Sequence, residues 1–130
     1  MAEAMETPLS RLELIYGSEK VASLAEKRVA VFGAGGVGGY IIEALARSGI
    51  GAIDIIDNDK VALSNLNRQI IAVRDTIGMM KTEAAKNRVM SIAPGCMVTG
   101  IPKFYAPDNA EEFDLSVYDY VADAIDFVPG

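Results

Sequence analysis

Histidine is absent from this chain of 130 residues, and cysteine occurs once, as Cys96. Histidine-dependent catalysis and an internal disulfide are therefore excluded within these residues, and one cysteine cannot supply the paired thiolates of most structural zinc sites. The chemistry must use carboxylates, Arg, Lys, Asn, backbone amides or a bound ion. These groups suit the handling of phosphates better than the hydrolysis of acyl groups.

Long apolar runs are also absent. No stretch approaches the roughly 20 consecutive apolar residues that cross a bilayer, and the N-terminal sequence MAEAMETPLS lacks the basic and apolar regions of a signal peptide. We therefore expect no membrane partner and a cytoplasmic location. Because 51% of the residues are hydrophobic and the chain is long enough to enclose one core, we expect one globular domain at most.

Basic residues are outnumbered, giving a formal net charge of −6, but they are concentrated in one segment. Residues 60–88 contain six basic residues and two acidic ones, whereas residues 108–126 contain seven acidic residues and no basic one. A local cationic block in an acidic protein favours a compact polyanion, such as a triphosphate, over a long nucleic-acid footprint.

Short apolar runs and the helical spacing between them predict alternating strands and helices. Strands joined through a helix in this way are parallel. We expect strands at residues 28–32, 52–56, 97–101 and 118–122. We expect helices at residues 9–16, 18–27, 37–48 and 79–93, with a short one from Pro107 to Glu112.

These elements predict an α/β fold with a Rossmann-like, doubly wound, mainly parallel sheet and helices on both faces. Residues 1–27 are expected to form an N-terminal helical segment, and residues 28–130 the nucleotide-binding domain. The sequence stops shortly after the last strand, without a helix to cover it, so we expect a domain that is truncated at the C-terminus. Such a domain would expose apolar surface, which dimerisation could cover.

The turn after the first strand matches G-x-G-x-x-G through Gly33, Gly35 and Gly38. The glycines permit a tight turn, the close approach of a phosphate and close helix packing, and the phosphate binds at the helix N-terminus. Asp57, 19 residues after Gly38, is expected to accept hydrogen bonds from ribose hydroxyls. A turn that only eases packing is the weaker explanation. NAD-dependent oxidoreductases use the same residues, so these residues alone favour NAD over ATP.

The connection after Asp57 favours a triphosphate instead. It reads DNDKVALSNLNRQ, which is longer and more polar than the ~2 to 6 residues of a simple strand-to-helix link. A triphosphate carries more negative charge than the pyrophosphate of a dinucleotide, and fixed cations must meet that charge. We expect Arg68 and Lys81 to do so.

Several motifs in order resemble one family. GAGGVG, DNDKVALSNLNRQ, GMMKTEAA and DAID are similar to the ubiquitin-activating-enzyme (ThiF-like) superfamily, whose bacterial members include adenylyltransferases that charge small sulfur-carrier proteins. RLELIYGSEKV, EALARSGIG and NLNRQI most resemble the tRNA threonylcarbamoyladenosine dehydratase branch. The last motif reads DAIDF at residues 123–127, where the sulfur-carrier enzymes have D-x-T-D-N, which also favours the dehydratase branch.

The resemblance implies ATP and Mg²⁺ as cofactors and a role for each matching residue. Asp126 would hold Mg²⁺, and Arg11 would reach the ATP of the partner subunit in a homodimer, although a solvent-exposed helix charge explains Arg11 equally well. The residues expected to bind the nucleotide are Gly33, Gly35, Gly36, Gly38, Asp57, Asp59, Asn65, Arg68, Gln69 and Lys81. Those expected to act in catalysis are Arg11, Arg68, Lys81 and Asp126.

The resemblance also implies the reaction, which is ATP-dependent adenylation of a carboxylate. The substrate would be the threonylcarbamoyl group of a modified adenosine in tRNA, and ring closure would follow with net loss of water. One alternative is adenylation of the C-terminal glycine of a small ubiquitin-like carrier protein. A non-catalytic nucleotide-binding module and an NAD-dependent oxidoreductase are the alternatives of another class. The acidic net charge fits a tRNA partner poorly, although the basic segment could supply a docking surface.

Overall fold

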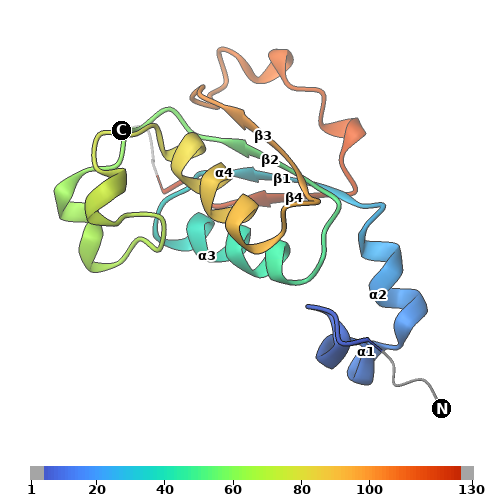
Figure 1. Cartoon of the computed structure of the whole chain (residues 1–130). Coiled ribbons are helices and arrows are strands. Elements are labelled where there is room, and N and C mark those ends of the chain that lie inside the picture. The colour runs from blue at the N-terminus through green and yellow to red at the C-terminus, as the bar shows by residue number, and fades with distance from the viewer. Residues whose placement is uncertain (1–4, 127–130) are drawn as a thin grey trace.

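The structure is a computed structural model and describes residues 5–126. The first four residues of the expected N-terminal segment and residues 127–130 of the expected nucleotide-binding domain lie outside the described residues. Phe127 of the DAIDF motif is among them. Four parallel strands form one sheet in the order β3-β2-β1-β4 (Figure 1). The expected Rossmann-like α/β fold is confirmed. The strands are β1 (Arg28–Phe32), β2 (Ala52–Ile56), β3 (Met97–Ile101) and β4 (Tyr120–Asp123).

One face of the sheet is covered by two helices, α3 (Gly36–Arg47) and α4 (Lys81–Ile92). Successive residues of a strand point to opposite faces, and Val31 of β1 and Ile55 of β2, both 0% exposed, point to this one. The helix α3 connects β1 to β2, and α4 connects β2 to β3. Because both right-handed connections cross the sheet in the same direction, both helices lie on the same face (Figure 1).

The other face is covered by residues 102–119, which carry the chain from β3 across to β4 (Figure 1). The rings of Tyr105 and Phe113 pack on Phe32 of β1, with centroids 4.7 and 5.7 Å away. The helix expected at residues 107–112 is only the 3₁₀ turn Ala110–Glu112. Within the described residues, this face is therefore covered by aromatic side chains on a largely irregular segment with short 3₁₀ turns.

A buried acidic residue fixes this segment to the sheet. Asp54 of β2 is 3% exposed, and its Oδ2 accepts hydrogen bonds from Arg28 Nη2 and from the hydroxyl of Tyr118, each at 2.6 Å. The Arg28 guanidinium also lies 5.0 Å from the centroid of the Tyr118 ring. Burial, followed by the bond to Asp54, raises the pKa of Tyr118 to about 12.

Two short helices precede the sheet, as expected: α1 (Ser10–Tyr16) and α2 (Ser18–Leu24). Gly17 joins them with a φ of +83°, a conformation that L side chains rarely adopt. The helix α1 buries none of its residues, and Leu14 is 83% exposed. Within residues 5–126, no helix combines the length and the apolar character needed to cross a membrane.

The single cysteine lies in the core between α4 and β3. Cys96 is 8% exposed and belongs to the cluster of buried apolar side chains on the helix-covered face. Burial raises the pKa of its thiol, against the smaller effect of a hydrogen bond with the backbone of Ile53. The thiol is therefore protonated near neutral pH and packs as a small apolar side chain.

Candidate nucleotide-binding site

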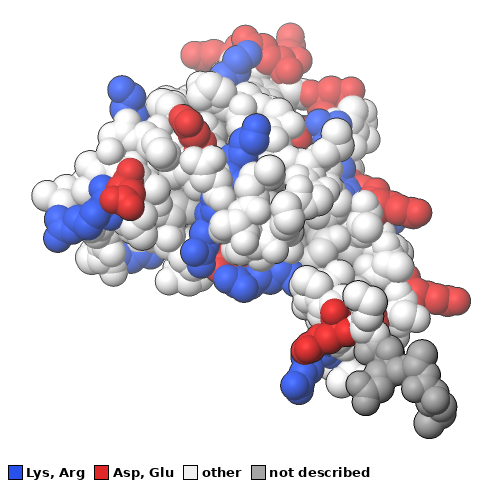
Figure 2. Space-filling view, viewed as in Figure 1, with Lys and Arg blue, Asp and Glu red and all other residues white. Residues whose placement is uncertain are grey.

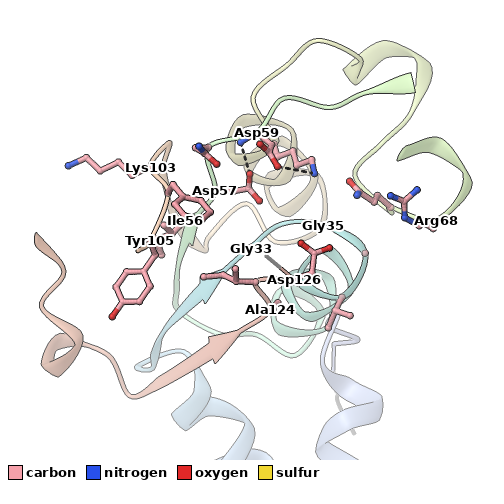
Figure 3. A pocket seen from close by; sticks show the side chains of 17 residues that line it. Gly33, Gly35, Ile56, Asp57, Asp59, Arg68, Lys103, Tyr105, Ala124 and Asp126 are labelled. Atoms are coloured by element: carbon pink, nitrogen blue, oxygen red, sulfur yellow. Dashed lines mark hydrogen bonds and ion pairs between the residues drawn. The ribbon is translucent and has the colours of Figure 1, made fainter. Parts of the chain in front are cut away.

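A cavity of about 210 Å³ opens at the carboxyl ends of the strands, beside the neighbouring strands β1 and β4 (Figure 3). The connection that leaves β1 and the one that enters β4 lie on opposite faces of the sheet, and ligands of open α/β sheets bind at such switch points. Nine of the residues predicted for the site line this cavity. They are Gly33, Gly35, Gly36, Asp57, Asp59, Arg68, Gln69, Lys81 and Asp126.

The glycine turn brings the backbone close to neighbouring segments. Gly33 has a φ of +96°, and a Cβ there would lie 2.7 Å from the carbonyl oxygen of Ala124. A Cβ at Gly38 would overlap the carbonyl oxygen of Gly33, so this glycine, which does not line the cavity, lets α3 pack against the turn. A Cβ at Gly36, the first residue of α3, would meet nothing within 4 Å. Gly35 and Gly36 both line the cavity, so the N-terminal end of α3, whose first N–H groups lack partners within the helix, borders it.

Asp57 is held by the backbone at the end of β2. Its Oδ2 accepts a hydrogen bond from the amide of Ala34, in the glycine turn, at 2.8 Å. Its Oδ1 accepts another from the amide of Asp59 at 2.7 Å. These two bonds fix the carboxylate beside the turn, and each oxygen keeps a lone pair that can accept a hydroxyl of a ligand.

Lys81 is a buried cation at the first residue of α4. It is 6% exposed, and its Nζ lies 4.0 Å from Oδ2 of Asp59, whose side chain is 70% exposed (Figure 3). A buried lysine normally has a close acidic partner, and a positive charge is unfavourable at the N-terminus of a helix. Among the described residues, Lys81 therefore has no close, buried acidic partner, and a bound anion could supply the negative charge.

Arg68 lies on the side of the cavity away from Lys103 and Tyr105 (Figure 3), and Gln69, the next residue, also lines the cavity. Arg68 Nη1 donates to the carbonyl oxygen of Ser64 and to Oδ1 of Asn67, at 3.0 and 2.8 Å. Gln69 is 8% exposed, and its Oε1 has no hydrogen-bond partner among the described residues. Both side chains thus keep polar atoms that a bound ligand could satisfy.

Besides Gly38, two more predicted site residues, Asn65 and Arg11, lie outside the cavity. Asn65 is 8% exposed, and its Oδ1 accepts the amide of Ala62 at 2.8 Å, so it shapes the 3₁₀ helix Leu63–Asn67 that precedes Arg68. Arg11 is an exposed residue of α1, a helix that contacts α2.

The cavity also has residues that sequence reasoning missed. Lys103, Phe104 and Tyr105, which come shortly after β3, line the cavity, and Lys103 and Tyr105 lie on the side opposite Arg68 (Figure 3). Lys103 Nζ forms an ion pair with Oε2 of Glu112 at 3.3 Å. The sequence could have indicated these residues, because the predicted strands β2 and β3 are parallel and their carboxyl ends lie at the same edge of the sheet.

The glycine turn at a helix N-terminus, the fixed carboxylate at the end of β2 and the switch point together define a nucleotide-binding protein of the Rossmann-like class. Within this class the sequence matches the ThiF family over residues 9–129. The chain belongs to the ThiF family.

Similar proteins are consistent with this assignment. The chain is 46% identical over 114 residues to the tRNA threonylcarbamoyladenosine dehydratase of Escherichia coli (strain K12), covering 88% of this chain and 42% of that protein. A crystal structure of the E. coli dehydratase in complex with ATP has a TM-score of 0.88 and 44% identity, covering 93% of this chain and 50% of that one. The adenylyltransferase and sulfurtransferase uba4 of Ogataea parapolymorpha is 36% identical over 104 residues, covering 77% of this chain and 27% of that protein. The chain therefore spans about half the length of the dehydratases it matches.

Proposed function

We propose that this chain binds ATP and forms the nucleotide-binding part of an enzyme that adenylates a carboxylate. The observation that carries the proposal is Lys81, a buried cation beside the glycine turn whose nearest acidic partner is 4.0 Å away and mostly exposed. Phosphates bound at the turn would supply the missing negative charge. The similarity to a dehydratase crystallised with ATP supports the same ligand here.

In adenylation a carboxylate oxygen attacks the α-phosphorus of ATP, pyrophosphate leaves, and an acyl adenylate forms. The step depends on stabilising negative charge on the phosphoryl groups more than on a base, which suits a site without histidine. Lys81 and Arg68 would bind phosphoryl oxygens and the departing pyrophosphate. Asp57, held by two backbone amides, would orient the ribose.

Mg²⁺ would neutralise part of the phosphate charge, and Asp126 is the residue proposed to hold it. Among the residues that the structure describes, no group of three or more His, Cys, Asp or Glu side chains is arranged to hold a metal. Protein-bound Mg²⁺ commonly uses one or two carboxylates together with phosphate and water oxygens. Asp126, which lines the cavity, fits an ion that arrives with the nucleotide.

The proposed carboxylate belongs to the threonylcarbamoyl group of a modified adenosine in cytoplasmic tRNA. Once it is adenylated, an atom of the same group would displace AMP and close a ring, so that the two steps together remove water. The 46% identity to a tRNA threonylcarbamoyladenosine dehydratase supports this substrate. The alternative, the C-terminal glycine of a small ubiquitin-like carrier protein, is favoured only by the more distant similarity to uba4.

The proposed assembly is a homodimer, in which residues 1–27 form an N-terminal helical segment and residues 28–130 the ATP-binding domain. Three observations support it: α1 buries none of its residues, Leu14 and Ile15 of α1 are 83% and 74% exposed, and Arg11 lies on the same helix. In a dimer these apolar side chains would be covered, and Arg11 would reach the nucleotide of the partner subunit.

Two measurements test the proposed function. ATP with Mg²⁺ should raise the melting temperature of the chain, and NAD should not. Exchange of labelled pyrophosphate into ATP should then depend on tRNA that carries threonylcarbamoyladenosine. Exchange only with a carrier protein would favour that alternative, and protection by NAD alone would indicate an oxidoreductase. ATP binding without pyrophosphate exchange, in this chain and in a longer form of the protein, would indicate a non-catalytic nucleotide-binding module.

A further inference from the structure

Away from the nucleotide cavity, one carboxylate orients two arginines. Glu43 of α3 has a side chain that is 12% exposed. It accepts hydrogen bonds from Nε and Nη2 of Arg88, on α4, at 2.9 and 2.8 Å. Arg47, one turn further along α3, donates from Nε to the same carboxylate at 3.0 Å. The two guanidinium groups, called the arginine pair below, carry one more positive charge than Glu43 balances.

The arginine pair borders a groove of about 620 Å³ between the segment before α1 and the C-terminal parts of α3 and α4. The side chains of Arg47 and Arg88 are 57% and 43% exposed, so both reach solvent beside this groove. Thr7 and Ser91 also line it, and none of the described residues that line it is acidic. A pre-oriented arginine pair suits phosphate oxygens, since guanidinium N–H groups match them in geometry and charge.

The charges around the arginine pair favour a partner with many phosphates. Basic side chains gather over α3 and α4 in Figure 2, whereas acidic ones crowd the opposite rim, where residues 102–119 run in Figure 1. The segment 60–88, with six basic residues and two acidic ones, ends at Arg88. A surface of this polarity steers an extended polyanion toward the helices and away from the acidic rim.

The two helices also connect the arginine pair to the nucleotide cavity. Gly36 and Lys81, their first residues, line the cavity. At the rise of an α-helix, Arg47 and Arg88 lie about 16 and about 10 Å further along. A macromolecule that places one phosphate on the arginine pair can therefore still reach the cavity with another part.

We propose that the arginine pair and its groove bind a backbone phosphate of RNA and so dock the tRNA substrate. The inference rests on the proposed function, which requires tRNA to approach the cavity. Arg88 and Glu43 also join α4 to α3, so the alternative is a purely structural role. Loss of a structural role would lower the melting temperature, whereas loss of docking would lower the affinity for RNA and change its dependence on salt.

The test uses the whole chain and an unmodified tRNA transcript, with binding followed by fluorescence anisotropy at increasing salt. The double variant Arg47→Gln/Arg88→Gln should bind at least about tenfold more weakly, and the slope of log affinity against log salt should fall by about 1 to 2. The control Lys20→Gln/Lys27→Gln removes the same charge from exposed positions in and after α2. It should bind tRNA like the natural chain.

The single variant Arg47→Gln keeps the hydrogen bonds between Arg88 and Glu43 that join α4 to α3, so it should still fold. It should also weaken tRNA binding and reduce the salt slope. Docking is overturned if the natural chain does not bind tRNA, if the arginine and lysine variants lose the same affinity, or if a polyglutamate peptide competes as well as tRNA. ATP protection and pyrophosphate exchange are measured separately. If the natural chain does not bind tRNA but is still protected by ATP, docking is overturned while ATP binding stands.

Discussion

Nζ of Lys81 lies 4.0 Å from Oδ2 of Asp59, and while the lysine is buried its acidic partner is 70% exposed. The two residues are also joined through the backbone, since the amide of Lys81 donates to the carbonyl oxygen of Asp59 at 2.9 Å. The loop after β2 therefore fixes the start of α4. It does so without bringing a buried carboxylate close to the ammonium.

Lys81→Met should abolish most of the protection by ATP and leave the ligand-free chain as stable as before. The exposed carboxylate contributes little to stability, and Met fills much the same volume without a charge. A tenfold loss of ATP affinity lowers the ATP-dependent stabilisation by about 1.4 kcal/mol at saturating ATP. Thermal melting with and without ATP measures both quantities. Lys86→Met, at an exposed position of the same helix, is the control. Equal protection of both variants would contradict the proposed role.

Gly38→Ala should destabilise the fold by about 3 kcal/mol, because the new methyl group would overlap the backbone carbonyl of Gly33, which cannot rotate away. Urea unfolding followed by circular dichroism measures the change. Gly95→Ala is the matched control, since a Cβ there would meet nothing within 4 Å and the φ of Gly95 is not positive. If both variants unfold at the same urea concentration, the close contact of Gly38 with the carbonyl group of Gly33 is contradicted.

Tyr118→Phe should cost about 1 to 2 kcal/mol near neutral pH, because Asp54 stays buried with one hydrogen bond fewer. The natural chain should also lose stability between about pH 10 and 12. The folded-state pKa of Tyr118, about 12, lies above its ordinary value of 10, so the stabilisation is complete below pH 10 and disappears as the pH rises. Chemical unfolding across this range should show that loss in the natural chain and not in the variant.

Glu43→Gln should make the free energy of unfolding less sensitive to acid. The hydrogen bond from Arg88, more than that from Arg47, lowers the pKa of Glu43 below its ordinary value of 4.5. A lowered folded-state pKa stabilises the fold above the ordinary value, and this stabilisation is lost as the pH falls through the folded-state pKa. Unfolding midpoints of the natural chain and the variant should therefore converge in acid. A constant difference from neutral to acidic pH would show that the charge of Glu43 has no part in stability.

The bounds of β1, β2 and β3 could be predicted from the sequence because each is a short apolar run bounded by turn residues. Most of the predicted site residues meet in one cavity for a related reason: parallel strands bring successive loops to one edge of the sheet. The cover of the opposite face could not be predicted in this way. The sequence predicts a short helix at residues 107–112, whereas the rings of residues 102–119 find their partners only in the folded sheet.

Contacts between distant residues explain the other misses. Asp54 and Tyr118 are 64 positions apart, and neither belongs to a motif, so their hydrogen bond has no local signature. In the sequence, Asp54 is only a polar interruption of a strand. The burial of Lys81 was likewise not predictable, since spacing indicates that a lysine starts a helix but not that the loop after β2 encloses it.

The burial of Cys96 limits how an activated acyl group could be passed on. A thiol must be deprotonated and reachable to displace AMP from an acyl adenylate, and this one is enclosed between α4 and β3 with its pKa raised. A thioester on this side chain would require the core to open. In the proposed reaction the acyl group would therefore pass to a nucleophile other than Cys96, and a nucleophile within the substrate itself meets that requirement.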